Sequence, residues 1–372
     1  MQAEMRIVYM LTSLGMGGAE RQVLALATRM KDRGHAVALV VLRPRLTEEW
    51  PTNLEVFHLN MRRRPLSLLT GLVRGRQFID RLNPDLVHSH SFHANLAARA
   101  LTLPAPAQRL ICTIHNVYEG GWGRMTAYRL SDGLADCATV VCKAAAMRFV
   151  GLKAVPQHKC VVLTNGIEIA EFVPSAERRI QIRVQMGMDG EFIWLAAGRI
   201  VPAKDLSNLL RAFARVKAAE PEAQLWIAGE TAGVEFERLC GLTLELGLGN
   251  RVRWLGLRRD LPALLDAADG FVLSSAWEGM PLAVGEAMAM EKPVVATDVG
   301  GVRELVGEAG RIVPARSPES LAQAMLEMMQ KPEEERRAMG LEARERIAKN
   351  FSMEAKADEW EAFYRTVLDD RS

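Results

Sequence analysis

The feature that most restricts the fold of this chain is a repeated alternation between short β-branched runs and segments with helical periodicity. Such alternation is typical of βαβ units, in which helices join parallel strands. A first helix is predicted over Ala19–Asp32. In the first half of the chain the pattern predicts strands near Arg6–Thr12, Ala36–Leu42, Leu86–Ser89, Leu110–Ile114, Thr139–Cys142 and Cys160–Leu163.

A second alternating series follows a polar stretch, residues 167 to 190, that we interpret as an interdomain connection. Its predicted strands are Phe192–Ala197, Gln224–Ala228, Val252–Trp254, Gly270–Leu273, Val294–Ala296 and Arg311–Val313. Its predicted helices are Asp205–Ala218, Val234–Leu246, Leu282–Met290 and Pro318–Gln330.

The length of 372 residues favours two domains, because one domain usually has about 100–200 residues. We expect an N-terminal α/β domain over 1–167, a C-terminal one over 168–350, and a final helix in 351–372. One face of that helix must be buried, because its apolar residues lie at i, i+3, i+4, i+7 and i+8: Trp360, Phe363, Tyr364, Val367 and Leu368. The helix could cross back to the first domain or pack on the second.

The five cysteines form no Cys-x-x-Cys pair, which argues against a zinc ribbon or a disulfide framework and favours a reducing cytoplasm. No apolar run approaches the roughly 20 residues of a membrane span. The N-terminus runs directly into a predicted core strand and lacks the cleavage site of a signal peptide.

Charge is distributed unevenly along the chain. Residues 1–165 carry 21 Lys and Arg against 11 Asp and Glu, whereas the remainder carries 26 against 34. The basic half suggests an anionic partner, such as nucleic acid or an anionic membrane surface, or else a solvated basic face. Aromatic residues make up only 6% of the chain, which argues against a stacking platform for nucleic acid.

Two glycine-containing segments follow predicted strands. Gly15-Met-Gly-Gly-Ala-Glu20 precedes the first helix, where free N–H groups could hold a phosphate, although a plain tight turn is the alternative. It fails the dinucleotide pattern because Glu20 stands at the sixth position. Gly198-Arg199-Ile-Val-Pro-Ala-Lys204 places two cations at the carboxyl end of a strand, where Arg199 and Lys204 could bind a diphosphate or simply be solvated.

The strongest motif is Ser274-Ser-Ala-Trp-Glu278-Gly-Met-Pro-Leu-Ala-Val-Gly-Glu286, between a strand and a helix. Glu278 falls in the loop and Glu286 in the second helical turn. Carboxylates repel a diphosphate, so both more plausibly accept hydrogen bonds from sugar and ribose hydroxyls. Helix capping with a surface glutamate is the alternative.

His115 ends a predicted strand and could bond a sugar hydroxyl or stabilise developing charge, although a structural role is the alternative. The nearby His88, His90 and His93 lack the spacing of a metal site, and we interpret them as a strand end and helix cap. The chain has no Asp-x-Asp pair to hold a divalent ion, so no metal is expected.

Taken in order, Gly17-Gly18-Ala19-Glu20, His115, Asn165-Gly166-Ile167, Gly198-Arg199 with Lys204, and Glu278-x7-Glu286 closely resemble glycosyltransferase family 4. The resemblance covers nearly the whole chain. It implies the GT-B fold, an α/β architecture of two Rossmann-like domains that face each other across a cleft. It also implies a retaining, metal-independent glycosyltransferase of the hexosyltransferase type, without a cofactor.

The resemblance further implies residue roles. Arg199 and Lys204 would bind the donor diphosphate, approached also by Gly17 and Gly18, and Glu286 would bond the ribose. His115 would contact the sugar near the reaction centre. Glu278 would hold the sugar hydroxyls together with the backbone of the segment Gly279, Met280, Pro281 and Leu282.

Two positions depart from the family pattern. Asp205 follows Lys204 where glycine is frequent, and Glu168 replaces the aspartate that often follows Asn-Gly-Ile. Both substitutions put the detail of the loops in doubt more than the activity.

The expected substrates are a nucleotide-sugar donor, with a UDP-sugar favoured, and a lipid-linked or saccharide acceptor in polysaccharide or glycolipid biosynthesis. The basic, partly apolar segment from Arg62 to Arg81 could lie on the inner face of the cell membrane, or pack on the N-terminal sheet. Two alternatives remain open: a nucleotide-sugar 2-epimerase on the same fold, and a non-catalytic protein that binds an anionic ligand.

Overall fold

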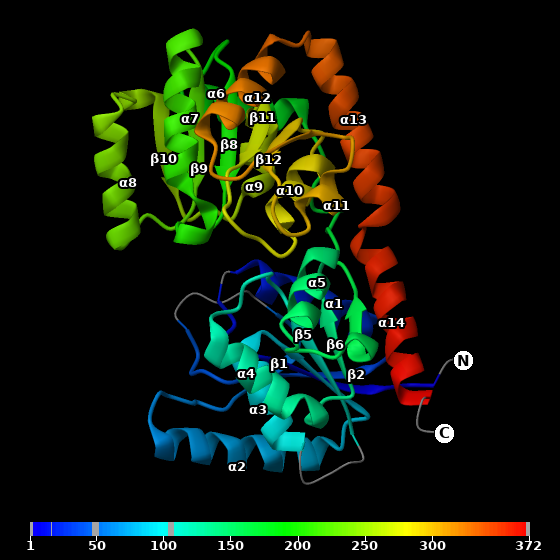
Figure 1. Cartoon of the computed structure of the whole chain (residues 1–372). Coiled ribbons are helices and arrows are strands. Elements are labelled where there is room, and N and C mark those ends of the chain that lie inside the picture. Colours follow the sequence, from blue (N-terminus) through cyan, green and yellow to red (C-terminus); the bar gives the residue numbers. More distant parts are fainter. Residues whose placement is uncertain (1–2, 16, 47–51, 103–107, 370–372) are drawn as a thin grey trace. The chain divides into compact units, whose positions relative to one another are not determined.

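The computed structural model describes residues 3–15, 17–46, 52–102 and 108–369, so Met16 of the first glycine-rich motif lies outside the described residues. The chain divides into two compact units. Unit 1 comprises Met1–Gly166 and Met353–Ser372, and unit 2 comprises Ile167–Ser352. Each unit is built on one parallel sheet with helices packed against it (Figure 1).

The sheet of unit 1 has the strand order β3-β2-β1-β4-β5-β6-β7, and all its pairings are parallel. The order reverses between β1 and β4, as in Rossmann-like sheets. The six predicted strands are present, and the sequence missed the short edge strand β3. The strands are β1 (Arg6–Leu11), β2 (Ala36–Val41), β3 (Glu55–His58), β4 (Leu86–His90), β5 (Arg109–Ile114), β6 (Cys137–Val140) and β7 (Cys160–Val162).

Alternate residues of each strand pack against helices on opposite faces of the sheet, as the two-residue period of a strand requires. Ile7 and Tyr9 join the cluster that contains α1 (Gly18–Asp32) and α14 (Met353–Asp369). Val8 and Met10 join the cluster of α2 (Pro65–Leu82) and α3 (Phe92–Thr102). A third cluster gathers around β6, from α4 (Trp122–Ser131) and α5 (Lys143–Gly151).

The C-terminal helix α14 belongs to unit 1, which decides between the two placements that the sequence left open. Trp360, Tyr364 and Val367 are buried and share a core with α1, and Arg33, the C-cap of α1, pairs with Asp358 at 2.7 Å. A Cβ on Gly166 would stand 2.9 Å from the Met353 Cα, so this crossing point requires glycine. In Figure 1, α14 is the red helix that carries the C-terminus.

Unit 2 repeats the same topology, with the strand order β10-β9-β8-β11-β12-β13. All six predicted strands are present: β8 (Ile193–Ala197), β9 (Gln224–Ala228), β10 (Val252–Gly256), β11 (Gly270–Leu273), β12 (Val294–Thr297) and β13 (Arg311–Val313). The helices α7 (Leu206–Ala219), α8 (Val234–Glu245) and α12 (Pro318–Gln330) pack on one side of the sheet. The other helices are α6 (Ala176–Gln185), α9 (Leu261–Ala267), α10 (Leu282–Ala289), α11 (Val302–Val306) and α13 (Glu333–Asn350).

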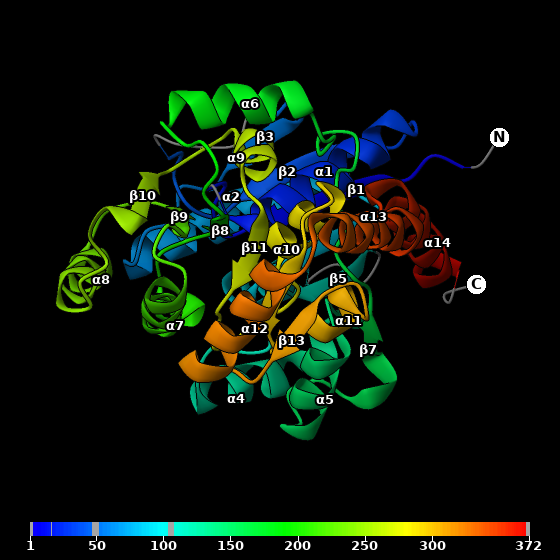
Figure 2. The same ribbon diagram turned by 90° about the horizontal axis from the view of Figure 1, so that it is seen from above.

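The prediction of an interdomain connection over residues 167 to 190 is wrong, because this stretch contains α6, which packs beside α9 within unit 2 (Figure 2). The helix lacks an apolar stripe, and its outer residues Ile180 and Val184 are exposed. Arginines hold it instead, which is why hydrophobic periodicity failed to reveal it.

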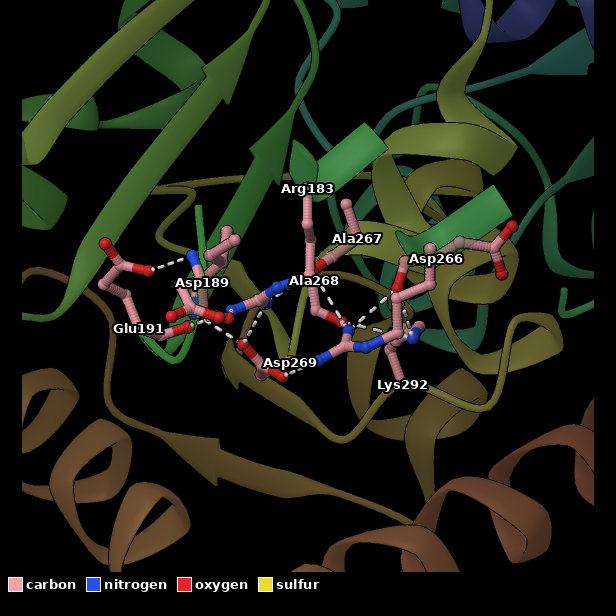
Figure 3. Close-up of polar contacts among 10 residues, drawn as sticks. Arg183, Asp189, Glu191, Asp266, Ala267, Ala268, Asp269 and Lys292 are labelled. Carbon is pink, nitrogen blue, oxygen red and sulfur yellow. Dashed lines mark hydrogen bonds and ion pairs between the residues drawn. The ribbon is translucent and has the colours of Figure 1, made fainter. Parts of the chain in front are cut away.

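Figure 3 shows the polar contacts that fasten α6. Arg179 donates to the carbonyl oxygens of Asp266, Ala267 and Ala268 at 2.9–3.0 Å, where α9 ends. These carbonyls have no partner within their own helix, so a guanidinium there both bonds them and suits the helix dipole. Lys292 donates to two of the same carbonyls. Burial lowers the pKa of Lys292 to about 8, and Arg179 adds to the shift.

Asp269 is the centre of this network. Its carboxylate pairs with Arg179 at 2.5 Å and with Arg183 at 3.2 Å, and accepts the backbone N–H of Ile193 at 2.8 Å. It therefore joins α6 to the first residue of β8. A variant without this carboxylate would leave the guanidinium groups of Arg179 and Arg183 without their opposite charge.

We predict that Asp269→Ala lowers the free energy of unfolding of unit 2 by about 3–5 kcal/mol, because two guanidinium groups and an amide lose their acceptor. Chemical denaturation followed by circular dichroism measures this loss. The control is Glu327→Ala, which removes a 3.3 Å ion pair with Arg311. The side chains of both residues are largely exposed. That variant should change stability by less than about 1 kcal/mol. Equal losses in the two variants would contradict the central role of Asp269.

Candidate functional site

The predicted site residues of unit 2 follow the two strands that flank the reversal of strand order. The segment Gly198–Lys204 leaves β8, and the segment Ser274–Pro281 leaves β11. Connections from these neighbouring strands run to opposite faces of the sheet, which opens a crevice at their carboxyl ends. The topology of unit 2 therefore brings both motifs to the position where α/β proteins bind ligands.

Lys204 and Glu278 are in direct contact in this crevice. The Lys204 Nζ lies 2.6 Å from the Glu278 Oε1, and the same oxygen accepts the Ser275 hydroxyl at 2.6 Å. The Glu278 carboxylate is only 8% exposed, and Lys204 is half-buried. The Ser274 hydroxyl donates to the Lys204 carbonyl oxygen at 2.8 Å, and the Ala276 N–H donates to the Ala203 carbonyl oxygen at 2.8 Å, so the two segments are also joined through their backbones.

Arg199 lies on the same segment as Lys204 but is exposed to solvent. The preceding Gly198 has a φ of +145°, a value that favours glycine. Gly229 directly follows the neighbouring β9, and a Cβ there would stand 2.3 Å from the Gly198 carbonyl oxygen. Two glycines thus let the segment turn out of the sheet and carry the Arg199 guanidinium into solvent at the carboxyl edge.

The departure from the family pattern at Asp205 has a structural explanation. Asp205 adopts a left-handed conformation, with φ 44° and ψ 50°, which glycine tolerates without strain. Aspartate also tolerates this region, and its carboxylate accepts the Asn208 N–H at 3.3 Å as the N-cap of α7. The helix cap offsets the backbone strain, so the loop keeps its course without glycine.

The loop that carries Glu278 is supported by residues that the sequence analysis missed. Gly300, in the connection after β12, has a φ of +55°, and a Cβ there would stand 2.2 Å from the Glu278 carbonyl oxygen. The next amide, of Gly301, donates to the Gly279 carbonyl oxygen at 2.6 Å. A Gly-Gly pair directly after a strand was the available signal for this close approach. No comparable signal marked Ser275.

Glu286 lies in the second turn of α10, as predicted, and is 2% exposed. Pro281 is the N-cap of α10, so it stands directly before the helix that the sequence predicted to begin at Leu282. Gly279, Met280 and Pro281 are buried and Leu282 is half-buried. Lys204, Glu278 and Glu286 therefore lie around one loop and one helix start within unit 2.

The predicted residues of unit 1 gather at the carboxyl edge of its own sheet. Gly17 is the N-cap of α1, and Gly18 is the first helical residue and exposed. A Cβ on Gly17 would stand 2.3 Å from the Glu20 carboxylate, so glycine leaves room for that side chain. His115 follows β5 and lines a small cavity to which Gln22 and Val23 of α1 also contribute. The helix start and His115 thus border the same region of unit 1.

The ring of His115 contacts a second histidine. Its Nε2 lies 3.0 Å from the Nδ1 of His90, the last residue of β4. His88, two residues earlier in the strand, bonds the Tyr364 hydroxyl of α14 at 2.7 Å and Thr113 at 2.6 Å. Burial lowers the pKa of His115 to about 4, and likewise lowers those of His88 and His90, so all three rings are neutral near pH 7.

Glu119, four residues after His115, shifts in the opposite direction. Burial raises the pKa of its carboxyl to about 7, although the Tyr128 hydroxyl donates to it at 2.6 Å. Near neutral pH this carboxyl is about half protonated. Burial thus favours the uncharged form of both His115 and Glu119, although Arg124 donates to the Glu119 carbonyl oxygen at 2.7 Å.

Within the described residues, no group of three His, Cys, Asp or Glu side chains is arranged to hold a metal ion. The described helices are likewise each too short or too polar to cross a bilayer.

Comparison with known proteins defines the class. The structure of Alr3699/HepE from Anabaena, in complex with UDP and glucose, matches with a TM-score of 0.84 at 21% identity, over 97% of this chain and 99% of that one. Two parallel, Rossmann-like units and such neighbours define the GT-B fold.

Two family models identify the family. Residues 178–346 match the model described as glycosyl transferases group 1, and residues 16–171 match glycosyltransferase family 4. The two matches together cover both units, and the chain belongs to glycosyltransferase family 4. It is a glycosyltransferase.

Curated relatives agree with this assignment. The alpha-D-kanosaminyltransferase of Streptomyces kanamyceticus is 28% identical over 80% of this chain and 82% of its own length. An Escherichia coli UDP-Gal:alpha-D-GlcNAc-diphosphoundecaprenol alpha-1,3-galactosyltransferase is 26% identical over 60% of each protein. The chain spans less than two thirds of the length of this second relative and of several others.

We predict that the protein loses stability as the pH falls from 7.5 to 5. The unfolded His115 binds a proton near pH 6.5, whereas burial keeps the folded side chain neutral down to about pH 4. Between these values the unfolded state binds more protons, so acid favours unfolding, by roughly 1–2 kcal/mol at pH 5 for this residue. Urea denaturation at the two pH values should show a smaller drop for His115→Asn than for the parent. Parallel pH dependences in the two proteins would contradict the burial of a neutral ring.

Proposed function

We propose that the protein is a retaining, metal-independent glycosyltransferase that moves a sugar from a UDP-sugar to a lipid-linked or saccharide acceptor. In this proposal unit 2 binds the nucleotide-sugar and unit 1 binds the acceptor. The contact between Lys204 and Glu278 at the carboxyl edge of the unit 2 sheet carries the proposal, because it combines a cation for phosphate with an acceptor for hydroxyls.

Lys204 and Arg199 are the proposed diphosphate ligands. A lysine supplies a compact positive charge, whereas an arginine can bind two phosphate oxygens at once. When the bond between the sugar and the diphosphate breaks, negative charge grows on the leaving phosphate. Cations already in place stabilise that charge, and this takes the role that a divalent ion has in other transferases. The absence of Asp-x-Asp from the sequence supports a metal-independent reaction.

Glu278 and Glu286 are the proposed hydroxyl ligands. The contacts of Glu278 with Lys204 and Ser275 converge on Oε1, so Oε2 is the oxygen that remains for a sugar hydroxyl. Glu286 is buried in the second turn of α10, where a ribose that follows the diphosphate can meet it. The backbone N–H groups of Gly279, Met280 and Leu282, at the start of α10, are proposed to complete the sugar site.

Retention of the anomeric configuration is supported by the α linkages that appear in the names of two relatives. The two curated relatives are named for alpha-linked products. Nucleotide donors of hexoses such as UDP-glucose carry an α-linked sugar, so an α-linked product means retention. A UDP-sugar is favoured because the galactosyltransferase is named for a UDP donor and HepE was solved with UDP and glucose.

The proposed reaction uses no enzyme nucleophile. The acceptor hydroxyl attacks the anomeric carbon from the face that the diphosphate leaves, and its proton passes to the departing phosphate oxygen. One carbon–oxygen bond breaks, another forms, and no electrons are exchanged with a cofactor. Gly17 and Gly18 offer backbone N–H groups at the start of α1 to the same phosphates, and His115 bonds the sugar near the reacting carbon.

We predict that UDP-glucose or a related UDP-sugar raises the melting temperature of the parent without added metal, also in the presence of EDTA. In Arg199→Ala and Glu286→Gln, donor affinity should fall about 10- to 100-fold, since each variant loses a charge-assisted hydrogen bond worth roughly 1.5–3 kcal/mol. Thermal-shift titration and calorimetry measure these affinities.

The matched control is Arg311→Ala, which removes an exposed arginine at the start of β13 that pairs with Glu327. This variant should bind donor as the parent does. A parent-like response of both site variants would disprove the site. A C2 epimer formed from donor alone, without acceptor, would reassign the protein as an epimerase.

The helix α2 supports a membrane-associated acceptor. Leu66, Leu69 and Val73 lie at i, i+3 and i+7, and are 74%, 60% and 51% exposed. Gly75 and Phe78 on the opposite side of the helix are buried in unit 1, so the apolar stripe points away from the core. An apolar stripe of this kind is suited to partial burial among lipid headgroups and acyl chains.

Basic residues accompany the stripe. Arg62, Arg63 and Arg64 precede α2 and are exposed, and so are Arg74 and Arg81 within the helix. Each basic residue near an anionic leaflet contributes about 1 kcal/mol to binding. We therefore propose a peripheral position on the inner face of the membrane, where lipid-linked acceptors are available.

We predict that the parent sediments with vesicles that contain phosphatidylglycerol but not with pure phosphatidylcholine vesicles. Replacing Arg63 and Arg64 by serine should weaken this binding by about 2 kcal/mol, or roughly 30-fold, and Leu69→Ser should weaken it further. The control Leu244→Ser changes a leucine of α8 that is 77% exposed in the acidic half of the chain. If that control weakens vesicle binding as much, α2 is not the membrane contact.

A further inference from the structure

The histidine that ends β4 controls the protonation site of the histidine that follows β5. We propose that His90 is a positioning residue that donates its Nδ1–H to the Nε2 of His115, and so holds His115 in the tautomer that carries its proton on Nδ1. This inference rests on the proposed function, in which His115 meets the donor sugar. The Nδ1–Nε2 distance of 3.0 Å between the two rings is that of a hydrogen bond.

The ring of His90 is fixed from two sides. It stacks against Tyr9 with the ring planes 18° apart and the centroids separated by 6.0 Å, and the centroid of His88 lies 4.0 Å away. The hydrogen bonds of His88 to Tyr364 and Thr113 hold that ring in turn, and Tyr364 bonds the Tyr9 hydroxyl at 3.1 Å. A ring held in this way cannot rotate to exchange its two nitrogens.

The other ring nitrogen of His90 decides the tautomer. His90 is 2% exposed, and its Nε2 is buried without a hydrogen-bond partner among the described residues. A proton on Nε2 would be a buried donor with no acceptor, which costs about 1–3 kcal/mol. Buried N–H groups without a partner are rarer than buried acceptors that lack one. The proton of His90 therefore belongs on Nδ1, where His115 accepts it.

Neither ring takes a second proton near neutral pH, since burial lowers the pKa of both histidines. One of the two facing nitrogens must then donate and the other accept. With His90 as donor, the His115 proton is on Nδ1. His115 thus presents an N–H to a ligand at that atom, and it cannot act there as a base.

The consequence for the proposed reaction is specific. A donor hydrogen bond from His115 Nδ1–H suits an oxygen of the sugar or an oxygen on which negative charge grows during transfer. A reversed tautomer would turn a lone pair towards the same oxygen and repel it. Loss of His90 should therefore reduce kcat more than it changes donor affinity.

Nuclear magnetic resonance of protein labelled with 15N-histidine tests the tautomer directly. In the parent at pH 7.5, His115 should show a protonated Nδ1 and an unprotonated Nε2, with its signals identified by their loss in His115→Asn. His90 should likewise show the proton on Nδ1. A proton on the Nε2 of His115 would overturn the inference.

Two variants connect the tautomer to catalysis. His90→Leu removes the donor, so the His115 signals should shift towards an average of both tautomers, and kcat should fall about tenfold with donor affinity within about twofold of the parent. His90→Asn can place an amide N–H at the former Nδ1 position and should restore both the tautomer and most of kcat. An unchanged tautomer in His90→Leu would refute the role of His90.

The control is His93→Asn, which changes an exposed histidine at the second residue of the neighbouring α3. It should leave the His115 spectrum and kcat unchanged. If His90→Leu fails to fold, the parent spectrum and His90→Asn still decide the question. The spectrum needs no substrate, so absence of sugar transfer would refute the proposed function alone, whereas the reversed tautomer would refute this inference alone.

Discussion

Parallel strand pairing at the point where the strand order reverses is the constraint on which the rest of the structure depends. β1 pairs with both β2 and β4, and β8 pairs with both β9 and β11, so the connections after these strands diverge to opposite faces. The first residues of these connections lie at the carboxyl edge of the sheet, where no helix covers them. Gly17, Gly198 and Glu278 all lie in such connections. The same topological event thus places the predicted site residues at the carboxyl edge of the sheet in each unit.

Much of this arrangement could be predicted from the sequence because it is local. Runs of β-branched residues indicated the position of every strand of unit 2. The glycine and the two cations after β8 indicated the carboxyl edge of that sheet. The edge strand β3 escaped notice because its four residues are only partly buried and carry little apolar signal. Helix α6 escaped because arginine contacts with Asp266 and Asp269 replace the apolar stripe that periodicity detects.

The remainder could not be predicted because it depends on contacts between distant segments. Gly300 meets the Glu278 backbone only once the connection after β12 has approached the loop after β11, and the order of residues gives no measure of that approach. His90 was interpreted only as part of a strand end and helix cap, because its contact with His115 depends on three-dimensional proximity. Burial then makes the histidines neutral, which is a property of the folded environment and not of the residue type.

The membership of α14 in unit 1 has a consequence for biosynthesis. The core that surrounds Tyr9 and Leu39 includes Trp360 and Tyr364, which the ribosome adds only after the whole of unit 2. Unit 2 is complete once Ser352 has emerged, whereas the first half of the protein must wait with part of its apolar surface uncovered. The half that is synthesised first is therefore finished last, and during translation it is the half most exposed to aggregation and most in need of chaperones.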